Sequence, residues 1–241
     1  MNTVWLIARR ELRAYLLSPL GYGVIAALLC LHGLYFNVTL LRGELSSYAV
    51  VEGFFYQSSA FVCAAGVLLS MRLFAEERQT GSILLLLTAP ASEWQLVAGK
   101  VVGALSFLGV YLVLSLYMPA LIAVNGDVSP GHLGAGYLGL ALLGAMAVAL
   151  GTLASALVTS QLLAAVLGGA MVSGLFLCWL IGSAVEGSFG DVIAYLDPMA
   201  NHHLAFARGI VKASAVVYEL SVVYVALLAA TLVLKLSRWN R

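Results

Sequence analysis

The sequence predicts an all-α integral membrane protein with six transmembrane helices and an additional amphipathic helix at the N-terminus. Of its 241 residues, 62% are hydrophobic and only 10% are charged, whereas water-soluble domains carry about 25% charged residues. A soluble domain of this size would also leave roughly a quarter of its unfolded surface exposed to water. Lipid is therefore the expected solvent for most of the chain.

Six apolar stretches are long enough to cross a membrane, because a hydrocarbon core of about 30 Å requires about 20 apolar residues in a helix. The predicted spans are residues 20–41, 54–73, 97–124, 133–158, 162–185 and 217–236. We expect them to form a single transmembrane domain that covers residues 1–241.

The basic residues predict the orientation of the spans. If both termini are cytoplasmic, nine of the twelve Lys and Arg residues lie on the cytoplasmic side. These nine are Arg9, Arg10, Arg13, Arg72, Arg78, Lys100, Lys235, Arg238 and Arg241. The other three are Arg42, Arg208 and Lys212. This asymmetry follows the positive-inside rule, so we expect both termini to be cytoplasmic.

Residues 3–18 are predicted to form an amphipathic helix in the membrane interface. Apolar side chains share one stripe of this helix, whereas Arg9, Arg10 and Arg13 lie outside the stripe. An alternative is that the segment extends the first span into the cytoplasm, but Pro19 favours a break between the two helices.

The predicted orientation places residues 186–216 on the external side, and this segment is too long for a simple turn. Asp197 and Pro198 have the residue types of a helix N-cap and a first helical position. The apolar residues that follow are Phe206, Ile210 and Val211. We therefore expect a short amphipathic helix at the outer membrane surface.

Few ionisable residues lie within the predicted spans. His32 is inside the first span, and His132 and Glu219 lie at span edges. Transporters driven by ion gradients usually place carboxylates at membrane depth. The sequence therefore disfavours an ion-coupled transporter, which stays open as an alternative, and we expect His32 to be a packing or interfacial residue.

No catalytic, cofactor-binding or metal site is predicted in this chain. Gly99 and Lys100 lack the other residues of a phosphate-binding loop. His202 and His203 would point apart on a helix and have no evident third metal ligand. The net charge of +1 provides no basic excess of the kind that nucleic-acid binding requires.

Small residues recur at four-residue spacing in the fourth predicted span, where Ala147, Gly151 and Ser155 share one face. Small side chains at this spacing allow helix backbones to approach closely inside a membrane. We expect a helix-packing seam here, either within the chain or between two subunits.

The polar stretch between the second and third spans, residues 74–92, carries the clearest functional signal. Glu76, Glu77 and Arg78 belong to a charged helix that Gly81 interrupts. An apolar run too short to cross a membrane follows, and Pro90 is expected to end it. A short helix that is charged on one side and apolar on the other can dock in a groove of a soluble partner. A simple interfacial loop is the alternative.

This stretch resembles that of the permeases of type-2 ATP-binding-cassette (ABC) exporters, whose second and third spans are joined by a similar Glu-Arg, Gly, apolar-run, Pro, Ser pattern. The opening ARRELRAYLLSPLGY resembles the family's cytoplasmic elbow helix, and Gln95–Lys100 resembles the start of its third span. DPMANHHLAFARGIV and SPLGY are most similar to the gliding-motility-associated permease subfamily. One difference is Leu84, which stands where family members often carry Glu.

The resemblance implies the membrane-spanning permease subunit of an ATP-driven exporter. Two such subunits, identical or different, would face each other, each resting on a separate cytoplasmic ATPase subunit that binds ATP and Mg. This chain would hold no cofactor and would not be an enzyme. Glu76, Glu77 and Arg78 would dock on the ATPase, Gly81 and Pro90 would shape the coupling element, and Arg9, Arg10 and Arg13 would belong to the elbow helix.

The resemblance also implies the bacterial inner membrane as the location, with membrane lipid around the spans. The external segment could contact a periplasmic or extracellular accessory protein, and the sequence does not specify the substrate. A membrane scaffold without transport activity is the other open alternative.

Overall fold

The computed structural model describes residues 3–40, 46–82, 91–185 and 187–239. Within these ranges the chain is almost entirely helical and has no β-strand. Six helical segments are long and apolar enough to cross a membrane. The predicted all-α membrane fold with six spans is therefore confirmed.

The chain begins with α1, followed by six membrane-spanning segments with short helices between them. The helices before the midpoint are α1 (Thr3–Leu17), α2 (Pro19–Tyr35), the π-helical turn η1 (Phe36–Leu40), α3 (Ser47–Ser70), α4 (Arg72–Gln79), α6 (Glu93–Ser115) and α7 (Tyr117–Asn125). The later helices are α8 (Pro130–Leu157), α9 (Gln161–Ala184), α10 (Ser188–Tyr195), η2 (Met199–His203), α11 (Leu204–Ala207) and α12 (Ala213–Trp239).

Several spans begin earlier than the hydropathy pattern predicts, and α3 and α8 are two examples. α3 starts at Ser47 rather than at residue 54, and α8 starts at Pro130 rather than at residue 133. The Ser46 hydroxyl caps α3 by accepting a hydrogen bond from a backbone N–H of its first turn. Proline suits the first helical position because it has no N–H to satisfy. Helix-starting signals therefore extend both helices beyond their apolar cores.

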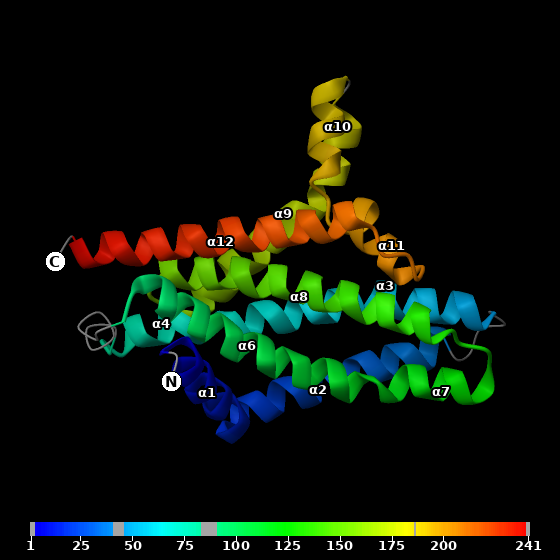
Figure 1. The fold of residues 1–241 in the computed structure, drawn as a ribbon, viewed down its shortest axis with the longest axis horizontal. Coiled ribbons are helices and arrows are strands. Elements are labelled where there is room, and N and C mark those ends of the chain that lie inside the picture. The colour runs from blue at the N-terminus through cyan, green and yellow to red at the C-terminus, as the bar shows by residue number, and fades with distance from the viewer. Residues whose placement is uncertain (1–2, 41–45, 83–90, 186, 240–241) are drawn as a thin grey trace.

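α8 lies at the centre of the bundle and packs against α3, α6, α9 and α12 (Figure 1). Glycines allow this close packing. A Cβ added at Gly66 of α3 would lie 2.8 Å from the Ala147 Cβ of α8. One added at Gly144 would lie 2.5 Å from a methyl group of Leu108 on α6. Such close approach of helix backbones supplies the van der Waals contact that holds helices together in lipid.

The two ends of the bundle differ in the elements that they carry. α1, α4 and the C-terminal end of α12 gather at one end, which we call the α4 end (Figure 1). The start of α3, the end of α7 and the start of α8 lie at the opposite end. The N-terminal and C-terminal helices therefore reach the same end of the molecule.

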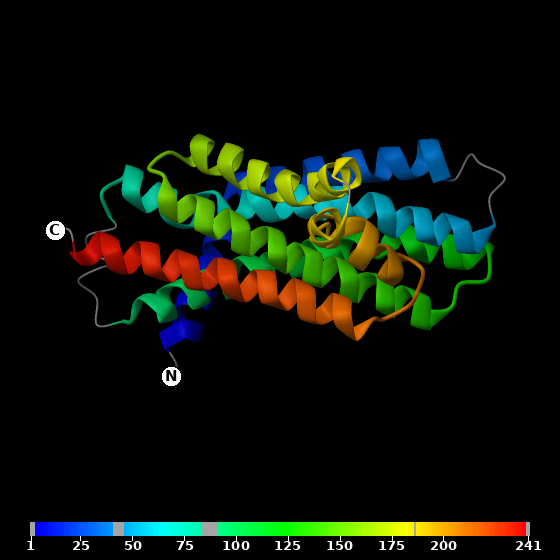
Figure 2. The same cartoon turned by 90° about the horizontal axis from the view of Figure 1, so that it is seen from above.

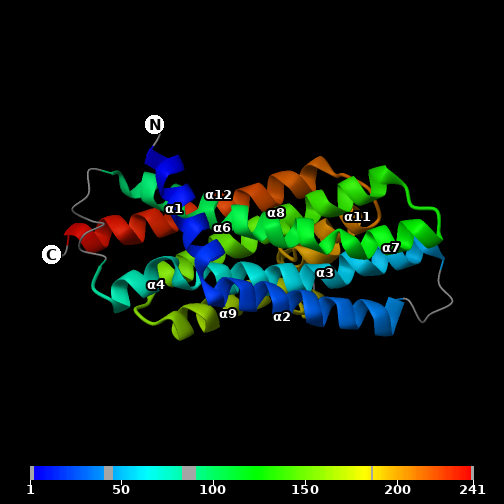
Figure 3. The same cartoon turned by 90° about the horizontal axis from the view of Figure 1, so that it is seen from below.

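α1 is a separate helix that crosses α6 at the α4 end (Figure 3). It ends at Leu17, and α2 begins at Pro19, so the two helices are not continuous. Tyr15 anchors α1, because its phenol donates a 2.6 Å hydrogen bond to the Leu69 carbonyl and its ring stacks on Phe107. Burial raises the pKa of Tyr15, which keeps this donor protonated.

The segment between α9 and α12 contains several short helices instead of one amphipathic helix. α10 packs against the end of α9 and stands out from the side of the bundle (Figures 1 and 2). The Asp197 carboxylate caps the next turn by accepting 3.0 Å hydrogen bonds from the N–H groups of Met199 and Ala200. The predicted capping role of Asp197 is therefore confirmed.

The expectation that Phe206, Ile210 and Val211 supply the apolar residues of one short amphipathic helix is wrong. Phe206 is buried in α11, but this helix ends at Ala207. Gly209 then adopts a φ of +79°, a left-handed conformation that favours glycine and ends helices. Ile210 and Val211 consequently lie beyond the helix and are exposed.

Candidate functional site

A buried lysine joins three helices at the α4 end. Lys100 of α6 is only 2% exposed. Its Nζ donates a 2.7 Å hydrogen bond to Glu77 Oε1 on α4 and a 3.2 Å hydrogen bond to Glu11 Oε1 on α1. The same ammonium lies 5.3 Å from the centre of the Phe74 ring. We call Glu11, Lys100 and Glu77 the charge triad.

The fold brings the charge triad together through close packing of α1 on α6. A Cβ added at Gly99 would lie 2.7 Å from the Ile7 Cβ, and one added at Gly103 would lie 2.6 Å from the Glu11 Cβ. The two glycines therefore form a flat surface on α6 against which α1 lies. This contact places the Glu11 carboxylate beside the lysine.

The break between α3 and α4 positions Glu77. Ser155 of α8 is fully buried at this break, and its hydroxyl donates a 2.9 Å hydrogen bond to the Met71 carbonyl. The same oxygen accepts the backbone N–H groups of Phe74 at 3.0 Å and Ala75 at 2.9 Å. One side chain thus satisfies two N–H groups in the first turn of α4, where N–H groups have no partner within the helix.

The small residues of α8 face α3 within the same chain. Ala147 meets Gly66, and a Cβ added at Gly151 would overlap the Ser70 hydroxyl. The packing seam of Ala147, Gly151 and Ser155 therefore lies inside this chain. Ser155 has a hydrogen-bonding role that its size alone did not indicate.

The other charged residues of α4 also bind inside the chain. Glu76 pairs with Arg72 one turn earlier, with 2.9 Å between Oε2 and Nε. Arg78 donates a 3.0 Å hydrogen bond from Nη2 to the Ser237 hydroxyl of α12. The side chain of Glu77 is 12% exposed and forms an ion pair with Lys100. Glu77 and Arg78, predicted as direct docking residues, therefore connect helices of this chain.

Gly81 follows the end of α4, where the sequence predicted an interruption of the helix. It adopts a φ of +74° and is exposed directly after Thr80, and this left-handed conformation favours glycine. Pro90 and the apolar run that precedes it lie outside the described residues, as does Leu84. The exposed tip of α4 consists of Gln79, Thr80 and Gly81.

A polar cavity of about 220 Å³ lies beside the charge triad. Its charged lining residues come from α1, α4 and α6 and carry both signs. They are Arg10, Glu11, Arg72, Glu76, Glu77 and Lys100. Glu77 Oε2 is buried without a hydrogen-bond partner among the described residues. Arg10 thus lines this cavity, whereas Arg9 and Arg13 lie on the exposed face of α1.

Two adjoining apolar cavities follow the groove between α3 and α9. They have volumes of about 560 Å³ and 470 Å³ and share Ala60 and Phe176 in their walls. Gly169 and Ser173 line one cavity, and Trp179 lines the other. We call this surface the α3–α9 groove.

The histidines that the sequence singled out lie at separate places. His32 is a buried packing residue, 3.0 Å from the Ser58 hydroxyl and 3.3 Å from the Tyr111 hydroxyl. His202 donates from Nε2 to the Tyr195 carbonyl, whereas His203 approaches the Phe55 carbonyl of α3. In the described part of the chain, no three metal-ligating side chains gather.

Glu219 was expected at a span edge. It lies within the apolar helix α12 and is fully buried. Neither carboxylate oxygen has a hydrogen-bond partner among the described residues. α12 begins at Ala213, so Glu219 lies about two turns after the start of the helix.

Sequence reasoning missed the roles of Lys100 and Glu11. Two signals were available. Lys100 is a single cation in the apolar stretch LVAGKVVGALSF, and Glu11 lies three residues after Ala8 and four before Tyr15 on the inward stripe of α1. A carboxylate on an apolar stripe indicates a buried cationic partner.

Comparison with known proteins places the chain among membrane transport proteins. The model of a family described as ABC-2 family transporter protein matches residues 24–238, a range that includes most of the first span and all of the others. No curated protein matches the chain. A match over this length, together with six apolar helices, shows that the protein belongs to the ABC-2 family of transporter proteins and is a permease subunit of an ABC transporter.

Proposed function

We propose that the chain is the permease subunit of an exporter driven by separate cytoplasmic ATPase subunits, and that the charge triad couples α4 to the spans. Membership of the family implies an ABC ATPase partner. The observation that carries the coupling proposal is the position of Lys100, which binds Glu77 on α4 and Glu11 on α1 at once. Movement of α4 would thereby reach both α1 and α6.

The contact with the ATPase would involve the exposed tip of α4 and the residues that follow it. Glu77 would act indirectly, by holding α4 to Lys100, instead of touching the ATPase. A buried ion pair suits this role because breaking it leaves an uncompensated charge, at a cost of about 3–5 kcal/mol. The ATPase states would then move α4, α1 and α6 as one unit, provided that they contact α4 differently.

Both termini would be cytoplasmic in this arrangement. Two observations support that orientation. The basic residues are concentrated at the α4 end, as the positive-inside rule requires of the cytoplasmic side. α1 and the end of α12 reach that same end (Figure 1).

The α3–α9 groove would face the second permease subunit, with the substrate passing between the two copies. Its walls are apolar, and small residues such as Ala60, Gly169 and Ser173 leave its floor open. α11 lies toward the end of the bundle opposite α4 (Figure 1), which would be the external side, and this part of the chain could contact an accessory protein there. The bacterial inner membrane and the gliding-motility-associated subfamily are supported by sequence resemblance.

Purification with partners tests the proposal directly. The chain would be isolated from its native membrane in a mild detergent, and co-purifying proteins would be identified and assayed for ATPase activity. We expect a stoichiometric ABC ATPase. Recovery without any ATPase, under conditions that preserve other membrane complexes, would favour a membrane scaffold instead.

Paired substitutions then test the coupling role. The double variant Glu77→Gln with Lys100→Met replaces both charges by neutral side chains and should leave the complex assembled. Reconstitution in lipid should, however, stimulate its ATPase activity less than it stimulates that of the wild type. The matched control is Glu93→Gln with Arg238→Gln, because this 2.8 Å ion pair also joins two helices at the α4 end but does not involve α4. Equal behaviour of the two double variants would refute the coupling role.

Glu219 is the observation that favours a second candidate function, ion-coupled transport. A buried carboxylate without a partner is typical of proton pathways in membrane proteins. Reconstituted vesicles with a pH-sensitive dye inside would detect proton movement through the wild type. The exporter proposal expects none, and a flux that Glu219→Gln abolishes would support the ion-coupled transporter.

A further inference from the structure

α1 has an outer face that combines positive charge with exposed apolar side chains. Leu6 and Leu17 are 46% and 71% exposed, and Arg9, Arg10 and Arg13 are exposed between them in sequence. A groove of about 420 Å³ runs along this face. Its lining residues are Leu6, Arg9, Arg10, Arg13, Ala14 and Leu17. We call this surface the α1 outer groove.

Arg9 and Arg13 of the α1 outer groove have no ion-pair partner among the described residues, whereas Arg10 also lines the cavity that holds Glu11 and Glu77. The ion pairs found among the described residues involve other cations, namely Arg72, Lys100, Arg208 and Arg238. The guanidinium groups of Arg9 and Arg13 lie one helical turn apart and repel each other in the absence of anions. The groove therefore fits an anionic ligand.

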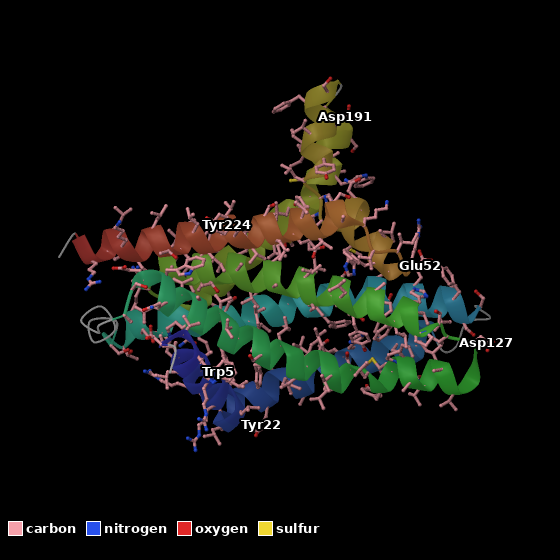
Figure 4. All side chains as sticks on the ribbon, in the orientation of Figure 1. Trp5, Tyr22, Glu52, Asp127, Asp191 and Tyr224 are labelled. Atoms are coloured by element: carbon pink, nitrogen blue, oxygen red, sulfur yellow. The ribbon has the colours of Figure 1, made fainter. Side chains whose placement is uncertain are left out.

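Aromatic residues frame the same side of the molecule. Trp5 of α1 and Tyr22 of α2 are both 59% exposed and lie on the outer side of the bundle (Figure 4). Trp and Tyr are enriched at the boundary between lipid headgroups and hydrocarbon, where one end of the ring is wet and the other is apolar. Their position indicates that the boundary passes along α1.

The position of α1 favours lipid over a protein partner. α1 crosses the side of α6 and does not cap the end of the bundle, so its outer face points sideways, away from the bundle axis (Figure 3). The tip of α4 and the end of α12 extend farther along the bundle axis (Figure 1). A soluble partner would meet those elements first.

We propose that the α1 outer groove binds the headgroup of an anionic phospholipid, such as phosphatidylglycerol or cardiolipin. Arginine presents several N–H donors in a plane and matches the oxygens of a phosphate group. Arg9 and Arg13, one turn apart, hold the phosphate, and Leu6 and Leu17 contact the first part of the acyl chains. The inference depends on the chain being in a membrane, but not on the proposed ATPase partner.

Native mass spectrometry of the purified full chain, with phosphatidylglycerol or phosphatidylcholine added, tests this site. We expect phosphatidylglycerol to bind at least about tenfold more tightly than phosphatidylcholine, because each basic residue near an anionic headgroup strengthens binding several-fold. Arg9→Gln with Arg13→Gln should reduce the ratio of the two affinities by about tenfold or more. Arg9→Lys with Arg13→Lys should retain most of it.

The control variant is Lys212→Gln with Lys235→Gln, which removes two exposed positive charges elsewhere. It should leave lipid preference unchanged, and all variants should unfold at the same temperature in detergent without added lipid. Equal binding of both lipids to the wild type would overturn the proposal. Loss of ATPase co-purification in the Arg9 and Arg13 double variant, with lipid preference intact, would also overturn it in favour of an acidic protein surface.

Discussion

The Ser155 hydroxyl of α8 donates a 2.9 Å hydrogen bond to the Met71 carbonyl at the point where α3 ends and α4 begins. Because the same oxygen accepts two backbone N–H groups of α4, this helix is attached to the central helix of the bundle. The break between the two helices is thus held by a side chain from a third helix.

Replacing Ser155 by Ala should destabilise the protein by about 1–3 kcal/mol, since buried backbone groups at Phe74 and Ala75 lose their partner. The midpoint of thermal unfolding in detergent measures the effect. Ser221→Ala is the control, because the Ser221 hydroxyl is exposed and bonds only within its own helix. Similar midpoints for the two variants would contradict the assigned role.

Removing one charge of the charge triad should destabilise the protein more than removing two opposite charges together. Lys100→Met leaves two acidic side chains without their cation and should cost about 3–5 kcal/mol. Adding Glu77→Gln should recover part of that loss, because one of the uncompensated charges is removed. A double-mutant cycle on unfolding midpoints measures this interaction, and strictly additive effects would argue against a buried pair.

Gly103→Ala should displace α1 from α6. The added methyl would lie 2.6 Å from the Glu11 Cβ and 3.0 Å from the Ala8 carbonyl oxygen. Overpacking of this kind typically costs about 1–3 kcal/mol. Limited proteolysis within α1 should become faster. Gly109→Ala, in the same helix with no atom within 4 Å of the added methyl, is the matched control and should leave α1 protected.

Acidification should destabilise the wild-type protein through His203. Burial lowers the pKa of this imidazole from 6.5 to about 4, so it stays neutral in the folded protein. Below pH 6.5 the unfolded chain binds a proton that the folded chain does not, and stability is lost as the pH falls toward 4. The loss at pH 5 should reach about 2 kcal/mol.

The comparison of wild type with His203→Gln isolates this contribution. Unfolding midpoints measured at pH 7.5 and pH 5 should fall less in the variant than in the wild type. An equal fall in both proteins would assign the acid sensitivity to other groups, of which His202 is the nearest, since burial lowers its pKa as well.

Hydropathy and length were sufficient to predict the six spans, because lipid requires long uninterrupted apolar helices. Pro19 likewise predicted the break after α1. Helix ends were less predictable where polar capping residues such as Ser46 extend a helix beyond its apolar run. Gly209 could have predicted the end of α11, since a glycine after Arg208 is a common helix stop.

The sequence predicted some residues of the candidate site but not the contacts that they make. Glu77 and Arg78 were identified by their position in the polar stretch, but their partners are far away in sequence. Lys100 pairs with Glu11 across 89 positions, and Arg78 reaches Ser237 across 159 positions. Such pairings follow from how the helices cross in space, which no local pattern encodes.

α3 and α4 together run over 33 residues, which corresponds to about 50 Å of helix at 1.5 Å per residue. The hydrocarbon core measures only about 30 Å, so this rod is longer than the membrane is thick. We expect the excess to act as a lever arm that projects from the membrane on the α4 side, so that a push on its far tip is passed to the lipid-embedded part through the junction at Ser155. Mechanical advantage would then be set by helix length, a quantity that insertion of one helical turn could tune.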